Sequence, residues 1–203
     1  MTVSRVSASD VVEFTRRYHY AGEASANACS WRWGLWHEFV LYGVVSYNLP
    51  TRSVCESVFG AQHFDKVWHM NRLVCADAAP RNSESRLIGQ SLRDINRLYG
   101  VWAVVTYADT NANHIGTVYQ ATNALYTGMS VVKPFFVDEE GNHRSRYQDG
   151  RTLTREMALE RNWTQHEGKA KHRYCYILGT KKQRSQRLRL LQFPVLPYPK
   201  ETH

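Results

Sequence analysis

The chain has 203 residues and a formal net charge of +8, and this length is sufficient for one domain with a buried core. No apolar run could cross a bilayer, and the first ten residues lack the apolar centre of a signal peptide. The four cysteines, Cys29, Cys55, Cys75 and Cys175, form no CxxC pair. The sequence therefore favours reduced thiols in an intracellular protein without a membrane partner, rather than disulfides or a zinc site.

The positive charge is concentrated at the C-terminal end of the chain. Residues 168–203 hold nine Lys and Arg against the single acid Glu201, whereas residues 1–167 hold 17 of each sign. Such segregation, with Tyr174 and Tyr176 interleaved, favours a polyanion partner and above all nucleic acid. The alternatives are an acidic membrane surface, or a solvated basic helix without a specific partner.

The hydrophobic pattern predicts strands and helices that alternate around one sheet, which is an α/β fold in a single domain over residues 1–203. Residues 3–7 read as a short strand, and residues 7–18 as a helix that ends at the motif YHYAG. Two strands over residues 31–36 and 40–48 form a predicted hairpin, and residues 66–75 form the next strand.

The following element is an amphipathic helix over residues 85–100. Its expected buried stripe consists of Leu87, Ile88, Leu92, Ile95 and Leu98. The remaining predicted elements are a strand over 104–107, a helix from Thr117 that places Val118, Ala121, Ala124 and Leu125 on one face, a strand over 130–138, a helix over 154–162, a strand over 172–178, a basic helix over 181–191 and a proline-bounded tail.

The stretch VVTYADTNANHIGTVYQATNALYTG joins a strand to a helix through a loop of small polar residues. The carboxyl end of a strand that leads to a helix N-terminus is a common ligand site in α/β proteins. Asp109, at the end of the strand, could accept a proton or hold an amine, or it could only cap the turn. Tyr119, in the first turn of the helix, could donate a proton to a leaving group, or it could be a packed aromatic.

Arg72 lies inside an apolar strand, in the motif HMNRLVC. A buried arginine is costly unless it pairs with an acid or binds an anion, and both readings stay open. Ser83 and Ser85, at the start of the following helix, lie where free N–H groups can be capped or can bind a donor group.

His19 and Tyr20 lie where the first helix ends, a position that can line a cleft. The alternative for His19 is an ordinary surface histidine. Trp31, Trp33 and Trp36 alternate with smaller residues, which favours core packing, although an extruded base would require one aromatic platform.

These motifs together resemble those of the Mom family of phage DNA-modification proteins, an outlying branch of the GNAT acyltransferase fold. The motifs YHYAG, GVVSYN, MNRLVC, SESRLIG, YAD…H-x-G-x-x-YQA-x-N-x-x-Y-x-G and KHRYCYILG cover roughly residues 10–180 in the order typical of that family. The resemblance implies a GNAT-like fold with a central mixed, largely antiparallel sheet flanked by helices. It also implies transfer of a small carbamoylmethyl- or methylcarbamoyl-type group to N6 of adenine, which shields phage DNA from restriction nucleases.

The family's functional residues correspond here to His19, Tyr20, Arg72, Ser85, Asp109 and Tyr119. The resemblance also implies iron, with His19, Tyr20 and Asp109 as its ligands; such a donor set suits iron. The motifs add three candidates for donor or substrate binding, namely His114, Gln120 and Asn123.

The donor-binding region departs from ordinary GNAT enzymes, which cradle the coenzyme A pyrophosphate in a loop of the form [RQ]-x-x-G-x-[GA]. This chain has RNSESRLIG at that place, and Glu84 would oppose a pyrophosphate. The departure argues against acetyl-coenzyme A as the donor and leaves the small-molecule donor open.

We therefore expect an enzyme that binds double-stranded DNA and flips an adenine into a cleft, in the cytoplasm of an infected bacterium. Asp109 would take the N6 proton, Tyr119 would serve the leaving group, Arg72 with Ser85 would hold the donor, and His19 with Tyr20 would form the adenine-side wall or the metal site. The expected DNA contacts are Lys169, Lys171, Arg173, Lys181, Lys182 and Arg184.

Two other functions fit the same residues. One is a GNAT-type acyltransferase acting on tRNA, a protein amine or a small amine, and the other is a DNA-binding phage protein with a degenerate site. The sequence does not fix the oligomeric state, although a dimer would suit a pseudo-palindromic site.

Overall fold

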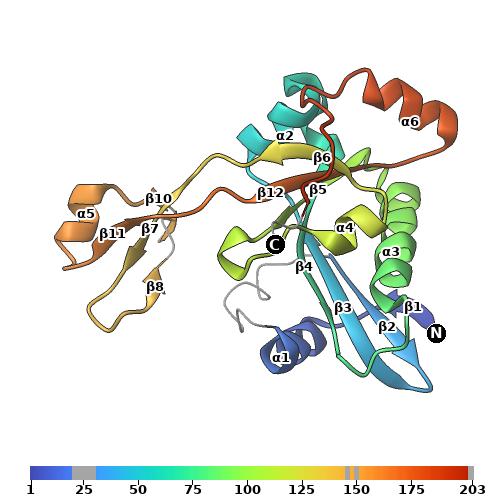
Figure 1. The fold of residues 1–203 in the computed structure, drawn as a ribbon, viewed down its shortest axis with the longest axis horizontal. Helices are drawn as coiled ribbons and strands as arrows, with labels where there is room; N and C mark the ends of the chain where they lie inside the picture. The colour runs from blue at the N-terminus through green and yellow to red at the C-terminus, as the bar shows by residue number, and fades with distance from the viewer. Residues whose placement is uncertain (20–30, 145–146, 149–150, 201–203) are drawn as a thin grey trace.

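The computed structural model describes residues 1–19, 31–144, 147–148 and 151–200, and it contains a seven-stranded mixed sheet (Figure 1). The strand order is β1-β2-β3-β4-β5-β12-β6. Only the neighbours β4 and β5 are parallel, and the other neighbouring pairs are antiparallel. The strands are β1 (Thr2–Arg5), β2 (Trp31–His37), β3 (Val40–Asn48), β4 (Val67–Cys75), β5 (Ala103–Ala108), β6 (Leu125–Met129) and β12 (His172–Ile177).

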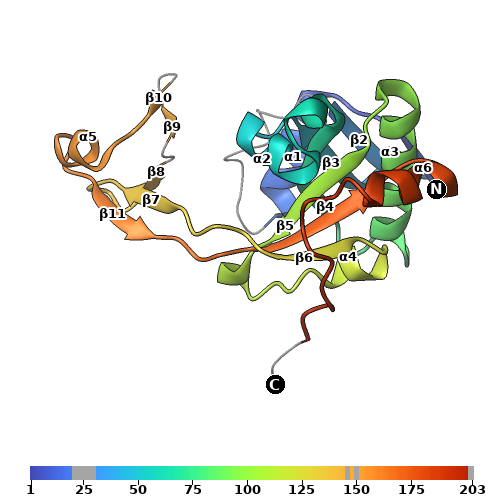
Figure 2. The ribbon, with the colours of Figure 1, turned by 90° about the horizontal axis from the view of Figure 1, so that it is seen from above.

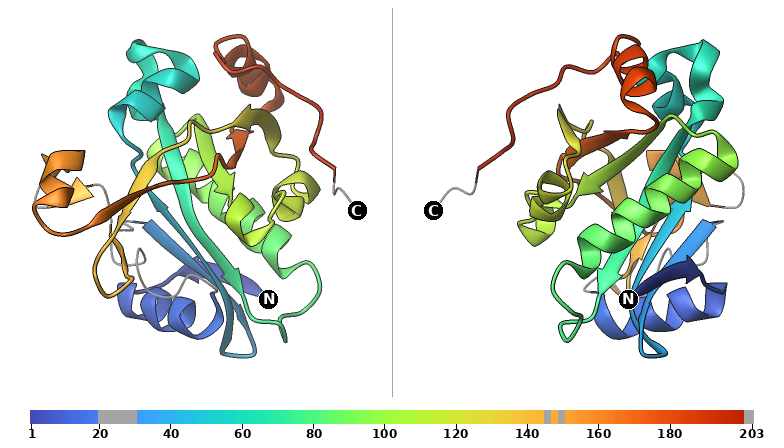
Figure 3. Two further views of the ribbon diagram at one scale, coloured as in Figure 1. Left: turned by 60° about the vertical axis from the view of Figure 1, so that its left-hand side comes forward. Right: turned by 90° about the vertical axis from the view of Figure 1, so that its right-hand side faces the viewer.

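Helices cover both faces of this sheet (Figure 3). Apolar residues of α3 pack with Trp33, Val45 and Tyr47 on one face, and apolar residues of α1 pack with Val44 and Val74 on the other. Because side chains alternate along a strand, the neighbours Val44 and Val45 serve opposite layers. The helices of the body are α1 (Ala8–Tyr18), α2 (Arg52–Phe59), α3 (Ser83–Tyr99), α4 (Thr117–Ala121) and α6 (Lys181–Leu188), with 3-10 turns η2 (Ala61–Lys66) and η3 (Thr110–Ala112).

An arm leaves the sheet between β6 and β12 and projects away from the body (Figures 1 and 2). Its small core contains Phe136, Leu153 and Ala158, with Met157 and Trp163 packed against them. The prediction of one domain over residues 1–203 stays a prediction. The arm consists of β7 (Pro134–Val137), β8 (His143–Arg144), β9 (Tyr147–Gln148), β10 (Arg151–Thr152), α5 (Arg155–Leu159) and β11 (Thr164–Glu167).

The predicted helix from Thr117 to Leu125 is wrong in its second half. The helix stops at Ala121, and Asn123 adopts a φ of 61°. A left-handed residue ends a helix. Leu125 therefore begins strand β6, which pairs with β12. The pattern also gave no sign of α2.

The buried stripe of α3 is confirmed except for Leu98. Leu87, Ile88 and Ile95 are at most 1% exposed, whereas Leu98 is 59% exposed. In this last turn Tyr99, and not Leu98, contacts the core. The centroid of its ring lies 5.0 Å from that of Trp68.

Cys55, Cys75 and Cys175 are free thiols, and Cys29 lies outside the described residues. None of the helices in the described part of the chain is long and apolar enough to span a membrane.

Truncation of the two α3 leucines should separate the buried stripe from the exposed end of the helix. We predict that Leu87→Ala lowers the free energy of unfolding by about 3 kcal/mol, because it leaves a cavity in the core. The matched change Leu98→Ala should cost less than about 0.5 kcal/mol. Urea denaturation measures both, and equal losses would contradict this description of the core.

Candidate active site

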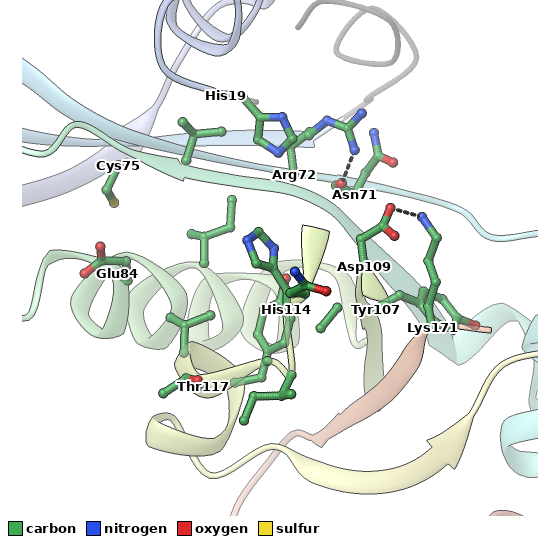
Figure 4. Close-up of a pocket in the computed structure, with 18 of the residues that line it drawn as sticks. His19, Asn71, Arg72, Cys75, Glu84, Tyr107, Asp109, His114, Thr117 and Lys171 are labelled. Atoms are coloured by element: carbon green, nitrogen blue, oxygen red, sulfur yellow. Dashed lines mark hydrogen bonds and ion pairs between the residues drawn. The ribbon is translucent and has the colours of Figure 1, made fainter. Parts of the chain in front are cut away.

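A cavity of about 590 Å³ lies where β4 and β5 separate (Figure 4). The two strands pair at Val67–Ala103, Trp68–Val104 and His69–Val105. Beyond that point β4 stays paired with β3 as far as Cys75, and β5 stays paired with β12 as far as Ala108. The separation therefore opens the sheet from within rather than at its edge.

A β-bulge accounts for the separation. Ser46 pairs with Arg72, but the next residue, Tyr47, pairs with Met70, so that Asn71 is an extra residue in β4. A bulge bends its strand and increases the local twist. Because this bulge lies two residues beyond the last parallel pair, β4 turns away from β5 at the point where the cavity begins.

Asp109 lies at the end of β5 and lines the cavity. Its Oδ1 accepts a hydrogen bond from the Asn111 N–H at 2.9 Å, and its Oδ2 accepts one from Lys171 Nζ at 2.6 Å. Burial alone would raise the pKa of Asp109, but the hydrogen bonds and the charge of Lys171 outweigh it and hold the pKa below its usual value. The side chain thus caps a turn and presents an ionised carboxylate to the cavity.

His19 and Arg72 lie on the side of the cavity that faces α1, and His114 lies across from them (Figure 4). Burial, together with the charges of Arg72 and His114, lowers the pKa of His19 to about 4. His19 is therefore neutral at pH 7. Its placement at the end of α1 agrees with the sequence prediction.

Tyr119 lines the cavity from α4, next to the ring of Tyr174. The Tyr174 hydroxyl donates to the Ile115 carbonyl, and Gln120 Nε2 donates to that hydroxyl at 3.0 Å. Only glycine fits at Gly116, because a Cβ there would lie 2.5 Å from Tyr174 Cε2. The ring and hydroxyl of Tyr174 thus fix the loop that forms one wall of the cavity.

The C-terminal segment supports the same wall. The Leu196 N–H donates to the Tyr126 carbonyl, and the Tyr198 hydroxyl donates to the Ala124 carbonyl, each at 2.9 Å. Gln120 Nε2 also donates to the Pro199 carbonyl at 3.4 Å. Gln120, predicted to bind the donor or substrate, therefore supports the wall through these hydrogen bonds and is not part of the described cavity lining.

The cavity gathers five of the predicted catalytic and donor- or substrate-binding residues, namely His19, Arg72, Asp109, His114 and Tyr119. Four others lie outside its described lining: Ser83, Ser85, Gln120 and Asn123. Ser83 is fully buried and donates to the Pro80 carbonyl at 2.5 Å. Glu84, between the two serines, does line the cavity, and Tyr20 lies outside the described residues.

The described residues do not by themselves fit an iron site. In the described part of the chain, no group of three His, Cys, Asp or Glu side chains is placed to hold a metal ion. Asp109 Oδ2 already accepts from the Lys171 ammonium, whose charge would oppose a cation at that oxygen.

The predicted DNA-contact residues separate into two groups. Lys171 lines the cavity, and Arg173 is held by two hydrogen bonds to Thr127 and lies 3.5 Å over the Phe193 ring. Neither side chain is a freely exposed cation. The exposed group consists of Lys169, Lys181, Lys182 and Arg184.

The exposed cations of α6 lie beyond the opposite end of β12 from the cavity. The six residues of β12 separate Lys171 from the turn into α6. At about 3.3 Å per residue this is roughly 20 Å, so the basic helix is remote from the cavity. Sequence spacing could not show this, because it does not reveal the direction in which β12 runs beside β5.

Solved structures with the same arrangement define the class of fold. The chain matches an acetyltransferase of Bacillus subtilis in complex with CoA, with a TM-score of 0.52 and 7% identity, over 87% of this chain and 98% of that one. It also matches a GNAT-family acetyltransferase of Bacillus cereus, with a TM-score of 0.50 and 7% identity, over 88% of this chain and 98% of that one. The predicted GNAT-like acyltransferase fold is confirmed.

Within that class, the sequence matches the model of the Mom protein family over residues 1–200, and the chain belongs to this family. It is 34% identical over 133 residues to the methylcarbamoylase mom of Escherichia phage Mu, a match that covers 64% of this chain and 55% of that protein. The matched region thus spans about half the length of the curated relative.

The histidine at the last parallel pair should make stability depend on pH. Burial, with the charges of Arg72 and Lys171, lowers the pKa of His69 to about 4, and its Nδ1 lies 3.1 Å from Asn48 Oδ1. Between pH 6.5 and 4 the unfolded chain binds a proton that the folded protein excludes. The free energy of unfolding should therefore fall as pH falls through this window, by up to about 1.4 kcal/mol per pH unit for each such histidine.

Urea denaturation from pH 7 to 4.5 measures this dependence. In the variant His69→Gln the free energy of unfolding should change less steeply with pH than in the wild type. In the exposed control His166→Gln it should change with pH as steeply as in the wild type. A slope unchanged in His69→Gln would contradict the assignment.

Proposed function

We propose that this protein is a phage DNA-modifying transferase that adds a methylcarbamoyl-type group to N6 of adenine and so protects phage DNA from host restriction. In this proposal it acts in the cytoplasm of the infected bacterium. The observation that carries the proposal is the convergence of Asp109, His19, Arg72 and Tyr119 on one cavity at the strand separation. Membership of the Mom family and the likeness to the phage Mu methylcarbamoylase support it.

The proposed chemistry begins with the acceptor amine. The N6 amine of adenine is a weak nucleophile, because its lone pair is delocalised into the ring. Asp109 accepts a hydrogen bond from this amine and takes its proton as the bond from N6 to the carbonyl carbon of the donor forms. Because Asp109 is ionised at neutral pH, it is ready to accept that proton.

Other cavity residues serve the donor and the leaving group. Tyr119 donates a proton to the leaving group as its bond to the transferred carbonyl breaks. Arg72 holds an anionic part of the donor. His19, which is neutral at pH 7, forms the adenine side of the cavity. Glu84 in the lining disfavours a pyrophosphate nearby, so that acetyl-coenzyme A is not the expected donor.

Double-stranded DNA is the proposed macromolecular substrate. An adenine stacked in a duplex cannot reach a cavity inside the sheet, so it must be flipped out. The exposed cations of α6 would contact phosphates at a distance from that base. A separation of roughly 20 Å corresponds to about six base-pair steps, which one duplex can span.

The second candidate is a GNAT-type acyltransferase for tRNA, a protein amine or a small amine. The fold that this chain shares with acetyltransferases supports it. Two results together would favour this candidate. One is binding of coenzyme A detected by calorimetry, and the other is unmodified adenine in cells that express the protein well.

The test of the proposed chemistry is the mass of deoxyadenosine. Plasmid DNA from bacteria that express the wild type should yield a heavier deoxyadenosine after digestion to nucleosides. Asp109→Ala should lose this product while the protein stays folded and binds a duplex. Modification at the wild-type level in Asp109→Ala would refute the role assigned to this carboxylate.

The test of the basic helix is the salt dependence of duplex binding. The triple variant carries Lys181→Ala, Lys182→Ala and Arg184→Ala. In this variant the plot of log K against log salt should become less steep, by about 0.9 for each phosphate that the helix no longer neutralises. Arg93→Ala with Arg97→Ala, which removes exposed charges from α3, is the control and should leave the slope unchanged. Fluorescence anisotropy with a labelled duplex measures both, and equal slopes would exclude α6 as a DNA contact.

A further inference from the structure

The position of Lys171 is not accounted for by the roles proposed for the catalytic residues or for the phosphate contacts of α6. Its ammonium lies 2.6 Å from Asp109 Oδ2 and lines the cavity, with 42% of its side chain exposed (Figure 4). The sequence predicted a DNA contact here, yet the side chain is directed at the carboxylate.

The backbone at Lys171 is fixed at the root of the arm. Its N–H donates to Ser130 Oγ at 2.9 Å, and its carbonyl accepts from the Ser130 N–H at 2.8 Å. The preceding carbonyl of Ala170 accepts from Thr110 Oγ1 at 2.8 Å, in the loop that follows Asp109. The base of the Lys171 side chain is therefore held in register with the loop that carries the carboxylate.

The two oxygens of Asp109 are held from different directions. The Asn111 N–H binds Oδ1 and the Lys171 ammonium binds Oδ2, and together they fix the plane of the carboxylate. A general base must keep its oxygen within hydrogen-bond reach of the proton that it takes. Without Lys171, the second oxygen could turn toward the positive charge of Arg72, which lines the same cavity.

We infer that Lys171 is a positioning residue for the transfer reaction, which fixes the Asp109 carboxylate toward the acceptor amine and does not bind DNA phosphate. This inference rests on the proposed function of Asp109. Lys171 would act through the general base Asp109, and it would connect the root of the arm to the site.

The experiment compares Lys171→Met, which keeps the length of the side chain but removes its charge, with the matched control Lys133→Met. Lys133 is exposed, lies three residues after Ser130 at the root of the arm and is absent from the described lining of the cavity. Three quantities are measured for each variant: the modified fraction of deoxyadenosine in co-expressed plasmid, the Kd for a labelled duplex with its salt slope, and the thermal midpoint.

A positioning role predicts that Lys171→Met lowers the modified fraction at least tenfold, while its duplex Kd and salt slope equal those of the wild type. Lys171→Arg, which retains a cation at this position, should recover part of the modification. Lys133→Met should modify DNA at the wild-type level. A thermal midpoint near that of the wild type for Lys171→Met would show that the loss is not unfolding, and Lys171→Gln provides a second variant if Met is poorly folded.

Two results would overturn the inference alone. One is a wild-type level of modification in Lys171→Met, and the other is a loss matched by weaker duplex binding and a lower salt slope, as expected for a phosphate contact. A wild type that leaves adenine unmodified would instead refute the proposed function, and this inference with it.

Discussion

The short parallel contact between β4 and β5 is the constraint on which the site depends. Three residue pairs join the strands, and the bulge at Asn71 then turns β4 away. Each strand keeps its outer partner, so the sheet remains continuous around the opening. Interior backbone groups must find hydrogen-bond partners, and a separation inside a sheet therefore provides a natural place for a ligand.

The walls of the opening come from segments far apart in the chain. The end of α1 brings His19, the end of β5 brings Asp109, and the root of the arm brings Lys171. One wall depends on Tyr174, which hydrogen-bonds the loop before α4 and is itself supported by Gln120. Because the C-terminal segment contacts Gln120 and the backbone after α4, it is part of the support of the site and not a loose tail.

The electrostatic pattern of the cavity follows from this assembly. The ammonium of Lys171 neutralises Asp109, and the burial of His19 keeps that ring uncharged at pH 7. Arg72 contributes a positive charge to the lining, and Glu84 contributes a carboxylate at another part of it. Under the proposed function, this arrangement suits a small donor with limited negative charge better than a pyrophosphate.

Local sequence patterns identified the elements that carry the site but not their pairing. The strand before Asp109, the buried stripe of α3 and the helix end at His19 were predictable, because periodicity and capping act over a few residues. The contact of Lys171 with Asp109 was not, because it depends on the antiparallel register of β12 against β5. Likewise the left-handed Asn123, which turns an apparent helix into β6, looks in sequence like an ordinary polar residue.

The most direct test of the proposed site is to locate the target adenine by photo-crosslinking. Duplexes of random sequence that contain 8-azidoadenine would be irradiated with the wild-type protein, and the labelled peptides would be identified by mass spectrometry. Labels are expected in residues 71–75, 107–109 and 113–119, which line the strand separation. Labels confined to α6 and the arm, with none at the separation, would contradict it.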